Sequence, residues 1–169
     1  VKALDDVSFN IQRGTVHALV GENGAGKSTL IKVLAGIYQP EKGEIDFDGK
    51  KRSCFKTPSE SQAAGISIIH QELNMMNHLT VAQNIYIGRE PKKGIFIDDR
   101  RMIEDAQKLF ERIGVDIDPS VKLGSLTVGK QQMVEIAKAV SHESRILVLD
   151  EPTAALTEAE VEELFAIMN

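Results

Sequence analysis

Two segments near the N-terminus alternate apolar and polar residues, as strands with one buried face do. The alternation predicts half-buried strands over residues 7–12 and 44–48, the second ending at Asp48-Gly49, a dipeptide typical of hairpin turns. A mostly apolar run over 16–20 predicts the end of a buried strand. The N-terminal part is therefore expected to contain a small antiparallel sheet.

Two further strands are predicted at 66–69 and 146–149. The second is four aliphatic residues in a row, a pattern typical of a strand buried on both faces of a parallel sheet. Ligands of open α/β sheets bind beyond the carboxyl ends of the strands. The polar residues at those ends, Gln71 after the first strand and Asp150-Glu151 after the second, are thus candidates for a site.

Helical signals dominate the rest of the chain. Apolar spacing, capping boxes and terminal glycines predict helices over 29–35, 58–64, 80–88, 102–114, 126–140 and 157–168. Residues 89–98 and 116–120 are expected to be loops. The pattern predicts a nucleotide-binding core, residues 1–72 and 142–169, interrupted by an α-helical subdomain over 73–141.

The stretch GENGAGKST fits the pattern G-x-x-x-x-G-K-[ST] between a predicted strand and a predicted helix. Its residues are Gly21, Glu22, Asn23, Gly24, Ala25, Gly26, Lys27, Ser28 and Thr29. Glycines let the backbone N–H groups wrap an anion, and a helix start adds unpaired N–H groups. Lys27 is expected to reach the β- and γ-phosphates and Ser28 to hold Mg²⁺, so the stretch predicts a nucleotide triphosphate site.

Phosphoryl transfer also requires a metal carboxylate and an oriented water. Asp150 is the candidate carboxylate for Mg²⁺, and Glu151 is the candidate base for the attacking water. Gln71 is placed to contact Mg²⁺ or the water, although a surface glutamine is an equally good interpretation of that residue alone.

Composition narrows the function classes. The 169 residues carry a net charge of -5 and no long basic run, which argues against nucleic acid as the main partner. No apolar stretch is long enough to span a membrane, and the single cysteine, Cys54, suits a reducing cytosol. Because the chain starts at Val1 within strand-like sequence, it is expected to be a fragment of a longer protein.

The ordered motifs together resemble the ATPase domain of an ATP-binding cassette (ABC) transporter. They are GENGAGKST, strand-end Gln71, LTVGKQQ from Leu126 and ILVLDEP from Ile146. HQELN from His70, QQMVEIAKA from Gln131 and EPTAALTEAE from Glu151 resemble the first cassette of bacterial monosaccharide importers of the ribose and galactose types. The resemblance implies a P-loop NTPase fold of the ABC type, with a mostly parallel core sheet.

The resemblance also implies ATP and Mg²⁺ as cofactors and a set of partners. Such cassettes dimerise head to tail, so the signature motif Leu126 to Lys130, including Thr127, Val128 and Gly129, would contact ATP held by a second cassette, here expected in the same full-length polypeptide. Gln71 would sense membrane-spanning permease subunits, and a periplasmic sugar-binding protein would act indirectly. The location implied is the cytoplasmic face of the inner membrane, as a peripheral subunit.

This sequence departs from the family pattern in three places. The usual signature is L-S-G-G-Q, but Thr127, Val128 and Lys130 replace three of its residues. The adenine-stacking aromatic and the switch histidine of the family match no residue of this chain. Two alternatives stay open: an ABC ATPase of a non-transport class, acting on ribosomes or in DNA repair, and a nucleotide-binding module with negligible turnover.

Overall fold

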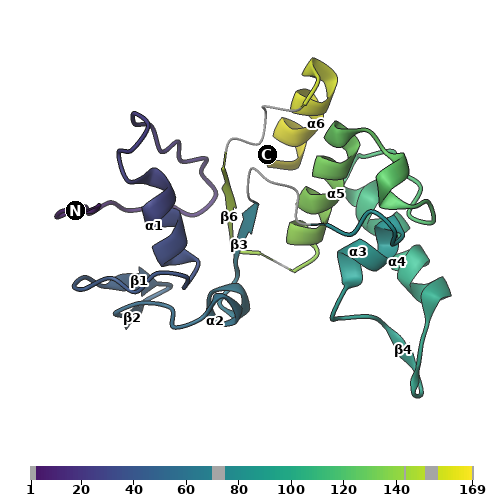
Figure 1. Cartoon of the computed structure of the whole chain (residues 1–169), viewed down its shortest axis with the longest axis horizontal. Coiled ribbons are helices and arrows are strands. Elements are labelled where there is room, and N and C mark those ends of the chain that lie inside the picture. The colour runs from purple at the N-terminus through teal and green to yellow at the C-terminus, as the bar shows by residue number, and fades with distance from the viewer. Residues whose placement is uncertain (1–2, 70–74, 143, 151–155, 169) are drawn as a thin grey trace. The chain divides into compact units, whose positions relative to one another are not determined.

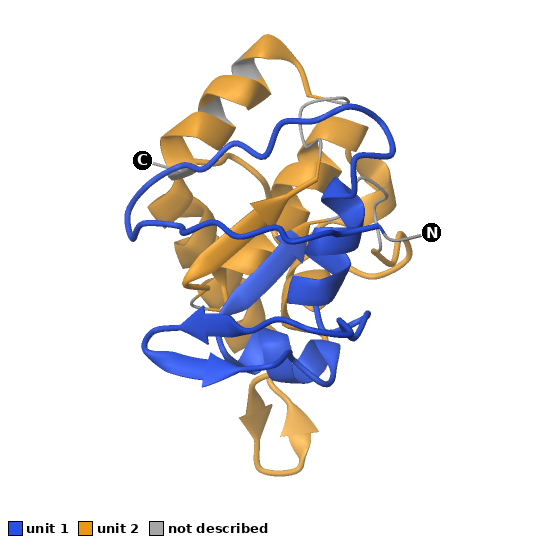
Figure 2. Cartoon of the chain, turned by 90° about the vertical axis from the view of Figure 1, so that its left-hand side faces the viewer, with its two compact units in different colours: residues 1–68 blue, residues 69–169 orange. Residues whose placement is uncertain are grey.

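The computed structural model describes residues 3–69, 75–142, 144–150 and 156–168 (Figure 1). Its contacts divide the chain into two compact units, residues 1–68 and 69–169, coloured separately in Figure 2. The division proposed above, with a core over 1–72 and 142–169 and a helical subdomain over 73–141, stays a prediction.

The first unit contains a helix, a hairpin and a short helix. Helix α1 (Lys27–Leu34) is followed by strands β1 (Ile45–Phe47) and β2 (Lys50–Arg52), which pair antiparallel. The turn between the strands has positive φ at both central residues, 58° at Asp48 and 75° at Gly49, as a type I′ hairpin requires. The predicted hairpin at Asp48-Gly49 is confirmed, and α2 (Pro58–Ala63) confirms the short helix.

The strands predicted over 7–12 and 16–20 are wrong, because neither segment has strand structure. Their large apolar residues are exposed: Val7, Phe9, Ile11, Val16, Leu19 and Val20. The rings of Phe9 and His17 stack 5.7 Å apart, so the two segments approach each other through side chains instead of through a hydrogen-bonded ladder. Alternation describes a face that a sheet can bury, but a strand also requires a backbone partner.

Helices form most of the second unit. They are α3 (Val81–Tyr86), α4 (Asp99–Ile113), the 3₁₀ turn η1 (Leu123–Ser125), α5 (Val128–Val140) and α6 (Glu158–Met168). Their apolar faces, with Ile69 at the end of β3 (Ile66–Ile69), form one buried cluster that includes Ile85, Phe110, Met133 and Leu164. The amphipathic helices predicted in this region are confirmed.

Two of these helices begin as their sequences predict. At α3 the Gln83 N–H donates to Thr80 Oγ1 at 3.2 Å, and Gln83 Oε1 accepts the Thr80 N–H at 2.9 Å. At α6 the Thr157 N–H donates to Glu160 Oε2 at 2.8 Å. Both capping boxes satisfy N–H groups that a helix start leaves unpaired.

The expected loop over 89–98 instead contains a small antiparallel hairpin, β4 (Lys92–Lys93) and β5 (Phe96–Ile97). Gly94, the first of its two turn residues, has φ of +66°, a conformation that glycine adopts without a steric cost. None of the helices in the described part of the chain has both the length and the apolar character needed to cross a bilayer.

Candidate functional site

The phosphate loop turns sharply into α1. Gly24 and Gly26 have φ of +86° and +92°, and Gly26 is the N-cap of the helix. A Cβ at Gly26 would lie 2.6 Å from the carbonyl oxygen of Ala3, so no larger residue fits this turn. Helix α1 has no side-chain cap and no acidic residue in its first turn, so no side chain of the helix neutralises its positive end.

Lys27 lies at the first position of α1. Its Nζ donates to the carbonyl oxygens of Gly21 and Glu22, the second at 3.0 Å, so the ammonium lies beside the first two residues of the phosphate loop. Ser28 is exposed at the next helical position. The loop thus combines a cation, a hydroxyl and a helix N-terminus within one turn, a set that suits a phosphate chain with its metal.

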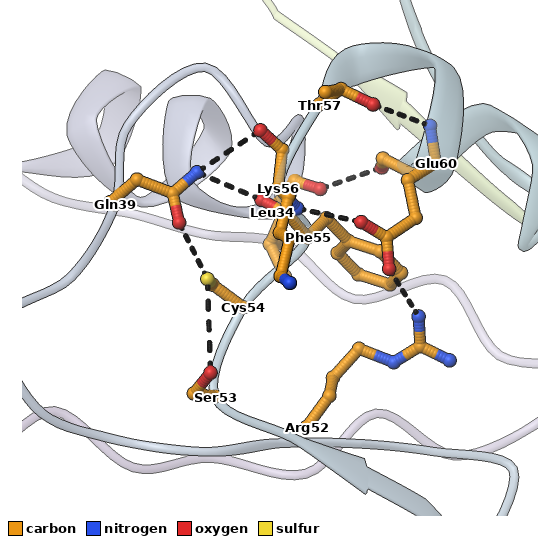
Figure 3. A network of polar contacts seen from close by, with 10 residues as sticks. Leu34, Gln39, Arg52, Ser53, Cys54, Phe55, Lys56, Thr57 and Glu60 are labelled. Atoms are coloured by element: carbon orange, nitrogen blue, oxygen red, sulfur yellow. Dashed lines mark hydrogen bonds and ion pairs between the residues drawn. The ribbon is translucent and has the colours of Figure 1, made fainter.

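Helix α1 is tied at its other end to α2 by a polar network (Figure 3). The buried hydroxyl of Ser61 donates to the Leu34 carbonyl at 2.7 Å. Gln39 Nε2 donates to the Phe55 carbonyl at 3.1 Å, and Cys54 Sγ donates to Gln39 Oε1 at 2.6 Å. These bonds fix the helix that carries Lys27.

The start of α2 belongs to the same network (Figure 3). The Glu60 carboxylate accepts the Lys56 N–H at 2.8 Å and a hydrogen bond from Arg52 at 3.4 Å. The Arg52 guanidinium also lies 4.6 Å from the ring centroid of the fully buried Phe55. A single carboxylate therefore links the end of β2 to the first turn of α2.

In the second unit, strand β6 (Ile146–Leu149) is followed directly by Asp150. The Asp150 N–H donates to the Ile69 carbonyl at 3.1 Å, so the ends of β3 and β6 lie side by side, as expected for a site at strand ends. Strand β6 is half-buried throughout, which corrects the prediction of burial on both faces.

Two candidate catalytic residues, Gln71 and Glu151, lie outside the described residues. They follow Ile69 and Asp150, whose backbone groups are bonded to each other. Among the residues that the structure describes, no three histidine, cysteine, aspartate or glutamate side chains gather as a metal site. The metal roles of Ser28, Gln71 and Asp150 stay predictions.

The signature segment forms the start of α5. Thr127 is the N-cap and its hydroxyl accepts the Lys130 N–H at 3.3 Å, while Gln131 Nε2 donates to the Leu126 carbonyl at 3.0 Å. Thr127 and Val128 are exposed there. The threonine at the usual serine position therefore keeps the capping role that a serine would have.

Gly129 is buried against a residue that the sequence patterns did not connect with it. A Cβ built on Gly129 would overlap both carboxylate oxygens of Glu160 in α6. Glu160 could be found from the sequence only as part of the capping box at Thr157. Its approach to the signature helix depends on the packing of α6 against α5.

The chain matches a protein-family model and solved structures over most of its length. Residues 4–154 match the family model described as ABC transporter. A solved nucleotide-free ATP-binding cassette from an ABC transporter shares 30% identity and a TM-score of 0.81, over 96% of this chain and 68% of that one. A dimeric ATP-binding cassette in a post-hydrolysis state, bound to ADP and Pi, is similar in fold, with a TM-score of 0.78 over 98% of this chain and 73% of that one.

Curated relatives match the whole chain. A ribose/galactose/methyl galactoside import ATP-binding protein of Burkholderia cenocepacia is 58% identical, and the chain covers 33% of its length. One of Albidiferax ferrireducens is 55% identical, with 34% covered. The chain thus spans about a third of these relatives. The match over 4–154 and the shared fold show that this chain belongs to the ABC transporter family, as an ATP-binding cassette.

Proposed function

We propose that the chain is the ATP-binding and ATP-hydrolysing part of a monosaccharide importer of the ribose or galactose type. The observation that carries this proposal is the 58% identity over the whole chain to a protein named for ribose, galactose and methyl galactoside import. The geometry of the Gly21–Thr29 loop supports the binding of ATP. The same family hydrolyses ATP to move a substrate across a membrane.

Each candidate residue has one role in this proposal. Backbone N–H groups of Gly21 to Thr29 and the Lys27 ammonium bind the phosphates. Ser28, Asp150 and Gln71 hold Mg²⁺, which neutralises charge on the transferring phosphoryl group. Glu151 orients and deprotonates the attacking water.

The proposed partners follow from the head-to-tail arrangement of such cassettes. Thr127, Val128 and Gly129 close over ATP bound by a second cassette, whose own signature completes the site built on Lys27. Permease subunits dock on the helical subdomain over 73–141, and a periplasmic sugar-binding protein delivers the sugar to them. The cassette then acts as a peripheral subunit at the cytoplasmic face of the inner membrane.

The test is transport by the full-length protein reconstituted with its permease in vesicles. With ATP on the cassette side, uptake of radiolabelled D-galactose or D-ribose is expected, and Lys27→Ala should abolish it while Lys32→Ala should not. ATP hydrolysis that no sugar stimulates, together with no uptake of either sugar, would favour a non-transport ABC ATPase. Measurement of turnover by the 169-residue chain alone decides whether it is a binding module only.

A further inference from the structure

The β4–β5 hairpin carries large apolar residues that stay exposed in the part of the chain that the structure describes. Exposure rises toward its tip, from 54% at Ile97 to 73% at Phe96 and 89% at Ile95. In both views the hairpin projects from the helices of the second unit (Figure 1, Figure 2). Three consecutive exposed apolar side chains on a projecting element are typical of an interaction site.

The pairing of the strands places apolar residues on both faces. Lys92 is opposite Ile97 and Lys93 is opposite Phe96, and directly paired residues share a face of the ladder. Neighbouring residues along a strand point to opposite faces. Each face of the hairpin therefore presents one lysine and one large apolar side chain, and Ile95 lies in the turn between them.

Because both faces of the hairpin carry an apolar side chain, a partner that surrounds the tip can bury more apolar surface than a flat partner that covers one face. A protein surface lying on one face would leave Phe96 or Ile97 in water. A layer of lipid headgroups and upper acyl chains takes in both faces when the tip enters first. Lysines at the base of such a tip can keep their ammonium groups at the phosphates while the stems stay in the apolar layer.

Charge supports the same partner. The segment 89–97 holds three basic residues and one acidic residue, whereas the whole chain has a net charge of -5. The nearest acidic residues lie at the base of the hairpin and not at its tip: Glu90 Oε1 accepts the Gly88 N–H at 2.9 Å, Asp98 Oδ1 accepts the Arg101 N–H at 3.1 Å, and Asp99 is the first residue of α4. An anionic bilayer surface would thus attract this hairpin while it repels most of the chain.

The base of the hairpin is anchored to its unit. The Asp98 N–H donates to the Pro91 carbonyl at 2.8 Å and closes the hairpin. Arg89 donates to the Ile85 carbonyl at 2.9 Å and to Ser141 Oγ at 2.8 Å, which joins the ends of α3 and α5. A tip held in this way binds without the cost of ordering a flexible loop.

We propose that the β4–β5 hairpin inserts its Ile95-Phe96-Ile97 tip into an anionic lipid bilayer surface, with Lys92 and Lys93 at the lipid phosphates. The contact is independent of nucleotide binding and of the identity of the sugar. Its effect is to hold the cassette against the bilayer by a second contact, beside the one to the permease in the proposed function.

A single tryptophan tests insertion, because the chain contains none. Phe96→Trp is mixed with vesicles of phosphatidylethanolamine and phosphatidylglycerol, and separately with vesicles of phosphatidylcholine alone. Only the anionic vesicles are expected to shift the emission to the blue, and brominated lipid should quench it. Phe165→Trp is the control, since Phe165 is also exposed, at 54%, but lies in α6, and its emission should not change.

Charge reversal gives the second arm, measured by co-sedimentation with the anionic vesicles. Each lysine near an anionic surface contributes about fivefold to binding, so Lys92→Glu with Lys93→Glu should weaken binding at least about 25-fold. Lys50→Glu with Lys51→Glu makes the same charge change on the β1–β2 hairpin, whose turn is Asp48-Gly49, and should have little effect. Circular dichroism checks that all variants are folded.

The proposal is overturned if Phe96→Trp emission stays unchanged on anionic vesicles, or if both lysine pairs weaken binding equally. Binding that appears only when permease subunits are present in the vesicles would assign the hairpin to a protein partner and also overturn it. Calorimetric titration with ATP should give the same affinity for all of these variants. Loss of lipid binding by the hairpin can therefore be distinguished from loss of ATP binding at the proposed nucleotide site.

Discussion

The carboxylate of Glu160 lies directly against Gly129, the second residue of α5. The three atoms nearest to a Cβ built on Gly129 all belong to that carboxylate. The same carboxylate accepts the Thr157 N–H at 2.8 Å and the Thr157 hydroxyl at 2.9 Å. The absence of a side chain at Gly129 thus leaves room for the capping box of α6.

Gly129→Ala is expected to lower the free energy of unfolding by about 1 kcal/mol, because the new methyl group displaces Glu160 from the cap. In a Glu160→Ala background the same change should instead stabilise, by a few tenths to about 1 kcal/mol, since alanine is the better helix former. Urea unfolding of the parent, the two single variants and the double variant gives the interaction energy between the two residues. Additive effects of the two substitutions would contradict the contact.

Lys27→Ala should weaken ATP binding about 10- to 150-fold, because a hydrogen bond to a charged group contributes about 1.5–3 kcal/mol. The fold should persist, since Lys27 bonds only exposed loop carbonyls. The matched control is Lys32→Ala, in the last turn of the same helix, where the ammonium lies 5.3 Å from the Tyr38 ring centroid. Calorimetric titration showing equal affinities for the two variants would remove Lys27 from the site.

Glu151→Gln separates binding from chemistry in the full-length protein. It keeps the size of the side chain but removes the base, so ATP binding should persist while hydrolysis falls about 10²–10⁴-fold. Asp150→Asn should instead reduce the dependence of ATP binding on Mg²⁺. The exposed Glu158→Gln serves as a control with unchanged hydrolysis. Hydrolysis by Glu151→Gln at the parental rate would mean that another residue is the base.

Ser61→Ala should destabilise the chain by about 1–3 kcal/mol, because its buried hydroxyl donates a hydrogen bond to the Leu34 carbonyl at 2.7 Å. Ser59 lies two residues before Ser61 in α2 and is exposed, so Ser59→Ala should change stability by less than about 0.5 kcal/mol. Thermal unfolding of both variants measures the difference. Equal melting temperatures would show that the α1–α2 link contributes little.

His142 is expected to make the free energy of unfolding decrease as the pH falls below neutral. Burial, with Arg89 and Lys138 nearby, lowers the pKa of His142 below its usual value. The unfolded chain therefore takes up a proton first as pH falls, so this contribution to stability is present above the unfolded pKa and is lost as pH falls through the folded pKa. Urea midpoints between pH 8 and pH 5 should fall less in His142→Gln than in the parent. Identical pH profiles for His142→Gln and the parent would contradict the prediction.

Much of the candidate site could be predicted from the sequence, because its signals are local. The turn of the phosphate loop depends on the backbone freedom of Gly24 and Gly26, and the capping boxes at Thr80 and Thr157 each lie within four residues. The amphipathic face of α4 follows from spacing alone. Such features hold whatever the rest of the chain does, because the interacting groups are close in sequence.

The features that needed the tertiary structure depend on partners distant in sequence. Residues 7–12 alternate in hydrophobicity but form no strand, because none of the described segments pairs with them in a ladder. Lys92–Lys93, by contrast, pairs with Phe96–Ile97 around Gly94, where a loop was expected. The carboxylate of Glu160 reached Gly129 only through the packing of α6 on α5. A hydrophobic pattern predicts which face of a segment is buried. Which residues cover that face depends on hydrogen bonds and packing with segments distant in sequence.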